Sequence, residues 1–154
     1  MGFRPGTENV AAIIGLAKAM ELVEEERERV FSSTGQLRSM LEKGIRERID
    51  DVQINGHLEK RLPNISNVSF RNVEGETLQL TLDMQGIAVS TGSACSSGSA
   101  ETSHVLTAMG VLQDMAQGGL RFSLGHITDE EGIAYVLDVL PDVVAKLREN
   151  PPGR

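Results

Sequence analysis

Aromatic residues are scarce in this sequence of 154 residues, which contains four Phe, one Tyr and no Trp. A core of ordinary size must therefore be built from Leu, Ile, Val, Ala and Met. Cysteine occurs once, so an internal disulfide is excluded and a reducing compartment fits. No apolar run is long enough to span a bilayer, and the first residues lack the apolar stretch of a signal peptide. These absences predict a cytoplasmic globular protein without membrane contact.

Basic residues are in the minority, with 15 Lys and Arg against 22 Asp and Glu and a net charge of −7. This balance argues against nucleic-acid binding through an overall basic surface. The three histidines are not clustered with Cys, Asp or Glu at the spacing of metal ligands. We therefore predict no metal site and no nucleic-acid partner.

The hydrophobic pattern predicts one domain over residues 1–150 and a short tail, 151–154. Apolar residues recur at helical spacing over about residues 7–50, which predicts a long N-terminal helix that Gly35 can bend or interrupt. Residues 77–84 alternate like a strand, but acidic residues precede them, which favours a helix. The other expected elements are strands at 52–54, 65–70, 86–89 and 120–124 and helices at 103–110 and from Thr128 onward. This order predicts an α/β (α+β) fold, in which helices cover one side of a small, mostly antiparallel sheet.

Two threonines have the position of helix caps. Thr7 is followed by Glu8, so it can cap the first helix, and this structural role is as probable as a functional one. Thr128 is followed three residues later by Glu131, which is the spacing of a capping box.

The one cysteine, Cys95, lies in a Gly/Ser-rich segment, residues 90–99. A structural cysteine usually lies among apolar neighbours, whereas a thiol on an accessible loop is suited to act as a nucleophile. An incidental loop cysteine explains the pattern equally well. His104, at the start of the next helix, could serve as a base for Cys95, although a histidine there is more often structural. The segment lacks the Gly-Lys-Ser/Thr ending of a phosphate-binding P-loop, which makes that match weak.

Arg121 lies in an otherwise apolar strand, beyond two glycines at 118 and 119. An arginine can hold a substrate carboxylate through two parallel hydrogen bonds. The alternative is an arginine that faces water at the edge of a sheet, and the pattern alone favours this alternative.

Four stretches of this sequence together resemble the C-terminal part of a cysteine desulfurase of the NifS/IscS kind. They are residues 2–10, 62–70, 90–98 and 120–125, and their order and spacing match along nearly the whole chain. The Ser-Gly-Ser-Ala-Cys form around Cys95 is similar to that of the NifS/IscS branch. These enzymes are class V aminotransferase-like, fold-type I proteins that use pyridoxal phosphate.

The resemblance implies a role for three residues. Cys95 would take the sulfur of L-cysteine as a persulfide, with release of L-alanine, and would pass it to a sulfur-acceptor protein. Arg121 would hold the substrate carboxylate. Thr7 would reach the cofactor phosphate of the partner subunit in a homodimer. Iron–sulfur cluster assembly and tRNA thiolation are both open as the receiving pathway.

The domain that carries the cofactor lysine in this family has no counterpart in the sequence. The four lysines lie on predicted helix surfaces or in a turn, and none is in a Ser-x-His-Lys setting. We therefore expect the chain to bind no pyridoxal phosphate alone and to be inactive by itself. A truncated product, half of a split enzyme and a stand-alone remnant are three open explanations.

Two other functions stay open. The chain could be a non-enzymatic dimerisation or interaction module in which Cys95 is idle. It could also be a class V aminotransferase relative that acts on another amino acid, which is the weaker alternative because such an enzyme needs no cysteine in this loop.

Overall fold

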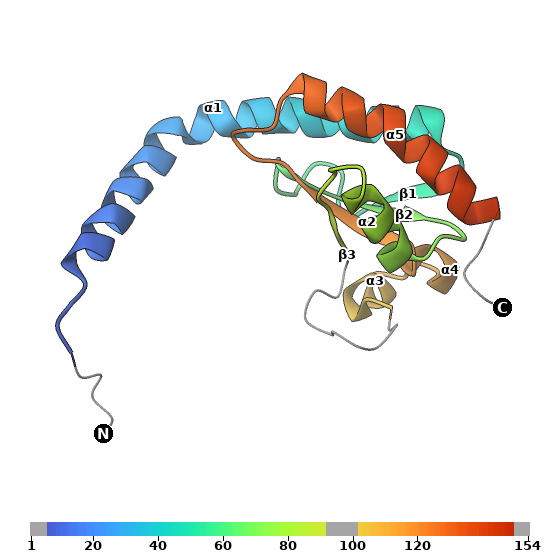
Figure 1. The fold of residues 1–154 in the computed structure, drawn as a ribbon, viewed down its shortest axis with the longest axis horizontal. Helices are drawn as coiled ribbons and strands as arrows, with labels where there is room; N and C mark the ends of the chain where they lie inside the picture. Colours follow the sequence, from blue (N-terminus) through green and yellow to red (C-terminus); the bar gives the residue numbers. More distant parts are fainter. Residues whose placement is uncertain (1–5, 92–101, 150–154) are drawn as a thin grey trace.

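The computed structural model describes residues 6–91 and 102–149 (Figure 1). The elements in chain order are α1 (Val10–Arg48), β1 (Val52–Asn55), β2 (Ile65–Phe70), α2 (Gly75–Asp83), β3 (Ser90–Thr91), α3 (His104–Ala108), α4 (Gln113–Ala116), β4 (Gly119–Ser123) and α5 (Glu130–Glu149). The four strands form one antiparallel sheet in the order β1-β2-β4-β3. The predicted mixed fold with a small antiparallel sheet is confirmed, and β1 lies at an edge as expected.

Three helices pack on the same face of this sheet. Side chains of α1, α2 and α5 share one core cluster with the alternating apolar residues of β2 and β4, among which Val68, Phe70, Leu120 and Phe122 are buried. Because successive side chains of a strand point to opposite faces, the residues between them lie on the other face. Figure 1 shows α5 lying alongside the C-terminal half of α1. The prediction of helices on one side is therefore confirmed for α1, α2 and α5.

The long N-terminal helix is a single helix of 39 residues, α1, which Gly35 does not interrupt. Its cap is Asn9, whose side-chain oxygen accepts a hydrogen bond from Ala12 N at 3.0 Å. The prediction that Thr7 caps the helix is wrong, because the helix begins at Val10 and the nearer Asn9 satisfies its free N–H groups. The N-terminal half of α1 extends away from the sheet (Figure 1).

The predicted strand at residues 86–89 is wrong. The N–H of Ile87 donates to the carbonyl of Leu82, so this segment closes the end of α2 instead of pairing with a strand. Gly86 makes that reversal possible with a φ of +76°. The strand begins at the next residue, where Ser90 and Thr91 pair with β4. The helix expected at 77–84 is present as α2.

The capping box expected at Thr128 is wrong as well. Asp129 Oδ1 accepts a hydrogen bond from Gly132 N at 2.8 Å, which is the pattern of an N-cap. Thr128 Oγ1 instead accepts from Gly125 N at 2.9 Å and closes the turn before α5. Thr128 and Asp129 could each cap α5, and Asp129 does so because it directly precedes the helix.

Candidate functional site

The sheet has a second face, which α1, α2 and α5 leave uncovered, and one row of polar residues crosses it from edge to edge. In the strand register Asn55 of β1 is opposite Asn67 of β2, Asn67 is opposite Arg121 of β4, and Arg121 is opposite Ser90 of β3. Directly opposed residues of antiparallel strands point to the same face, with Cβ atoms about 4.5–5.5 Å apart. We call these four residues the polar row.

Arg121 is the charged member of the polar row. Its neighbours along β4, Leu120 and Phe122, are buried, whereas Arg121 is exposed. Among the described residues none forms an ion pair with its guanidinium or accepts a hydrogen bond from it. The arginines that tie the fold together differ, since Arg61 and Arg148 bind internal carboxylate or carbonyl oxygens. The donors of Arg121 are thus free of acceptors within residues 6–91 and 102–149.

A buried ion pair holds β2, and with it Asn67, against α1. Glu42 is 7% exposed, and both of its carboxylate oxygens accept from the guanidinium of Arg61, at 2.8 and 2.7 Å. Ser66 Oγ donates to the same carboxylate at 2.7 Å. Ser66 directly precedes Asn67 and points to the helix-covered face, so this contact fixes the strand beneath the polar row.

Two close backbone approaches hold the other end of the sheet. Gly118 lies so near the Phe70 carbonyl oxygen that a Cβ there would collide with it, and Phe70 N donates to the Gly118 carbonyl at 3.1 Å. A Cβ on Gly119 would lie 2.8 Å from Leu106 of α3, which covers this end of the second face. Glycine at these positions lets the 111–118 segment meet β2, and this aligns β4 in register.

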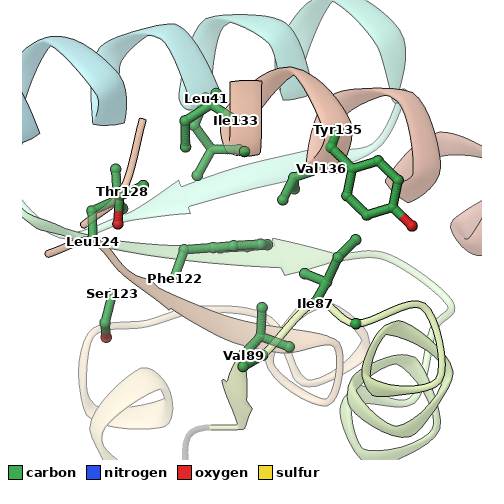
Figure 2. A pocket seen from close by; sticks show the side chains of 13 residues that line it. Leu41, Ile87, Val89, Phe122, Ser123, Leu124, Thr128, Ile133, Tyr135 and Val136 are labelled. Atoms are coloured by element: carbon green, nitrogen blue, oxygen red, sulfur yellow. The ribbon is translucent and has the colours of Figure 1, made fainter. Parts of the chain in front are cut away.

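A cavity of about 320 Å³ lies on the opposite, helix-covered side, between α5, β4 and residues 86–89. Figure 2 shows Phe122 of β4 surrounded by Leu41, Ile87, Ile133 and Val136. No charged residue lines this cavity among the described residues. It is separated by the sheet from Arg121, so it does not form part of the polar row.

The three predicted site residues have different outcomes. Cys95 lies outside the described residues, in the chain segment between β3 and α3. Arg121 is on the uncovered sheet face, next to Ser90, after which the Cys95 segment begins. Thr7 is exposed and precedes α1, whose N-terminal half extends away from the sheet that carries Arg121 (Figure 1). His104, the alternative base, is exposed at the start of α3.

Sequence reasoning assigns no site role to Asn55 or Asn67. Asn55 looked like part of a turn with Gly56, and Asn67 was one polar residue interleaved in a strand. One signal in the sequence pointed to Asn67, because Asn is depleted in strands and Asn67 lies within a predicted strand. Only the register shows that both belong to the row that contains Arg121.

The described residues do not fit pyridoxal phosphate as a binding site of their own. The cofactor needs a lysine amine, and Lys18 and Lys43 are exposed on α1, where they pair with Glu21 and Glu47. Lys60 is exposed in the β1–β2 connection and Lys146 on α5. None of these lysines belongs to a strand of the sheet. Within residues 6–91 and 102–149 no group of His, Cys, Asp and Glu could hold a metal ion.

Comparison with known proteins identifies the family. The sequence profile described as aminotransferase class-V matches residues 1–136. The chain belongs to this family. The family uses pyridoxal phosphate.

In the described part of the chain no helix is both long and apolar enough to cross a membrane.

Several relatives of the chain are named as cysteine desulfurases. The chain is 48% identical over 149 residues to the cysteine desulfurase IscS of Dictyoglomus turgidum, a match that covers 97% of this chain and 38% of the relative. Among solved structures, a NifS-like protein is 39% identical with a TM-score of 0.80, over 95% of this chain and 36% of that one. A NifS-like protein from Rickettsia africae is 29% identical with a TM-score of 0.77, over 92% of this chain and 36% of that one. The chain thus spans less than two fifths of the length of these relatives.

Proposed function

We propose that this class-V chain is the C-terminal part of a pyridoxal phosphate-dependent cysteine desulfurase. The observation that carries the proposal is the polar row, in which Arg121, without a partner among the described residues, lies opposite the strand that leads into the Cys95 segment. The 48% identity to a desulfurase over 97% of the chain supports the same reaction.

In the proposed reaction Arg121 holds the carboxylate of L-cysteine and Cys95 receives its sulfur. The carbon–sulfur bond of the substrate breaks, and a new sulfur–sulfur bond forms on the Cys95 thiolate. The bonding electron pair stays on carbon, which takes up a proton and gives L-alanine. The persulfide then passes its outer sulfur to an acceptor protein. Thiolate character at Cys95 is the requirement on the protein side, because the thiolate is the nucleophile.

The cofactor and its lysine belong, in this proposal, to a part of the enzyme that this chain does not contain. All four lysines are on exposed surfaces, away from the sheet. Thr7, at the far end of α1, would reach the cofactor phosphate of a partner subunit in a homodimer. This fits the course of α1, whose N-terminal half extends away from the sheet within one chain.

The N-terminal half of α1 supports the presence of such a missing part. Every residue from Val10 to Arg29 is exposed, and seven large apolar side chains are among them. They are Val10, Ile13, Ile14, Leu16, Met20, Leu22 and Val23, which we call the α1 stripe. Exposed apolar patches of this kind mark an interface. We propose that the rest of the enzyme covers the α1 stripe.

The proposal is tested with a chimera in which this chain replaces the matching 38% of the Dictyoglomus turgidum relative. With pyridoxal phosphate and L-cysteine the chimera should release sulfide and alanine in the presence of a thiol, and Cys95→Ala should abolish both. The isolated chain, under the same conditions, should show no absorption band of lysine-bound cofactor and no product. An inactive but folded and cofactor-loaded chimera would refute the assignment.

A second assay separates this function from a non-enzymatic interaction module. The isolated chain is incubated with a low-molecular-weight persulfide, and its intact mass is measured. A sulfur carrier should gain one sulfur atom at Cys95 and lose it to a thiol acceptor, whereas the Cys95→Ser variant should not. Failure of the wild-type chain to load would favour the interaction module.

A further inference from the structure

The polar row contains a hydrogen-bond relay between side chains that ends beside Arg121. Asn55 Nδ2 donates to Asn67 Oδ1 at 2.6 Å and to Ser69 Oγ at 2.8 Å. Asn55 is 6% exposed, so these bonds form out of contact with bulk water. A primary amide has two N–H donors, and both donors of Asn55 are used.

The relay determines the orientation of the Asn67 amide. Its oxygen faces Asn55, and its nitrogen therefore points away from Asn55, because the two atoms stand on opposite sides of the amide carbon. Among the described residues no acceptor binds Asn67 Nδ2. Arg121, the next residue along the row, also has its donors free of described acceptors. Two donor groups from adjacent strands thus stand side by side on the uncovered face.

We propose that Asn67 is a second donor to the carboxylate that Arg121 binds, and that Asn55 is the positioning residue that orients it. This inference rests on the proposed function, since it assigns a further residue to the same substrate group. A carboxylate has about four acceptor positions, so it can bind the arginine fork and still accept from an amide. An acceptor placed between these two groups could bind to both, because both present N–H donors.

The buried oxygen of Asn55 supports a role beyond stability. Asn55 Oδ1 has no hydrogen-bond partner among the described residues. An unpaired buried acceptor is unfavourable for folding, so packing alone does not explain an amide at this position. An amide is required if its nitrogen must hold the Asn67 oxygen. An aspartate of the same shape would accept instead of donate, and it would turn the Asn67 nitrogen away from Arg121.

The chimera tests this prediction through KM and kcat for L-cysteine. Asn67→Ala should raise KM roughly tenfold, as expected for one hydrogen bond to a charged group, and leave kcat within about twofold. Asn55→Asp should have a similar effect. Gln53→Glu is the matched control, because it makes the same chemical change on the same strand at an exposed residue that does not contact Asn67. It should leave both constants unchanged.

Three results would separate the inference from the proposed function. A KM that rises in Arg121→Ala but not in Asn67→Ala overturns the inference and leaves the function intact. A KM that rises equally in Asn55→Asp and Gln53→Glu overturns the positioning role, because added negative charge then explains both. A wild-type chimera that is folded but inactive overturns both proposals.

The isolated chain gives an independent measurement that needs no activity. Acetate, with sodium chloride as the matched salt, is titrated into the ¹⁵N-labelled chain. The carboxylate should shift the side-chain NH₂ resonances of Asn67 and the Nε–H of Arg121. Asn55→Asp should remove the Asn67 shift and keep that of Arg121. A shift of Arg121 alone in the wild-type chain overturns the inference, and a shift of neither group overturns the carboxylate site itself.

Discussion

Asn67 on β2 and Arg121 on β4 are directly opposite each other in the antiparallel register, on the sheet face that α1, α2 and α5 leave uncovered. The pairing continues through Ser90 on β3, which is followed by the chain segment that contains Cys95. Arg121, for which we propose substrate binding, and Ser90, after which the cysteine segment begins, are thus brought together by the sheet itself. The segment that contains Cys95, the proposed nucleophile, follows β3 in the sequence, and β3 pairs with β4 at Arg121.

The first prediction concerns the guanidinium of Arg121. Arg121→Lys in the chimera should lower kcat/KM roughly 30-fold, which is a loss of about 2 kcal/mol of transition-state stabilisation. Lysine keeps the charge but loses the two parallel hydrogen bonds that a guanidinium makes. Arg121→Ala should have a larger effect. Steady-state kinetics with L-cysteine measures both. Arg46→Ala, an exposed arginine on α1, serves as the control, and an equal loss there would remove the specific role of Arg121.

The second prediction concerns the buried Glu42–Arg61 ion pair. Glu42→Ala should lower the free energy of unfolding of the isolated chain by about 3 kcal/mol, because it leaves the Arg61 charge without its partner. Urea denaturation followed by circular dichroism measures the change. Glu47→Ala, which removes an exposed ion pair of 3.8 Å with Lys43, should cost at most about 0.5 kcal/mol. Equal losses in both variants would show that the Glu42 pair does not anchor β2.

The third prediction concerns the glycine that precedes β4. Gly118→Ala should destabilise the chain by about 2 kcal/mol, because its Cβ would meet the Phe70 carbonyl and the backbone has to shift. Gly15→Ala on the exposed part of α1, where a Cβ meets nothing within 4 Å, should instead be neutral or slightly stabilising. Thermal unfolding of the two variants gives the comparison. A stable Gly118→Ala chain would contradict the close approach of β2 and residue 118.

The fourth prediction concerns the α1 stripe. Ile14→Glu and Val23→Glu should leave the stability of the isolated chain nearly unchanged, because the side chains are 63% and 67% exposed there. In the chimera each substitution should lower the free energy of unfolding by about 1.5–3 kcal/mol, because the α1 stripe becomes buried against the rest of the enzyme. Denaturation of both proteins is compared for each variant. If the chimera is as tolerant as the isolated chain, the rest of the enzyme does not cover this stripe.

Local pattern was enough to predict most of the secondary structure. The long apolar period of α1, the alternation of β2 and the acidic start of α2 are properties of neighbouring residues, and all three elements are present. The failures lie where a tertiary contact decides. Residues 86–89 carry a strand-like run, but the Ile87 N–H is used to close α2, and only Ser90 and Thr91 reach β4. At the starts of α1 and α5 the caps are Asn9 and Asp129, and not the predicted Thr7 and Thr128.

The sequence by itself determined the class of fold, the family resemblance and two residues of the proposed site, Cys95 and Arg121. These depend on composition, period and short motifs, which are local properties of the chain. The tertiary structure alone decided that Asn55, Asn67, Arg121 and Ser90 form one row. The physical reason is strand register, because a shift of one residue in any strand would move its member of the row to the opposite face. Buried contacts far apart in the sequence, such as Glu42 with Arg61 and Ser66, fix that register.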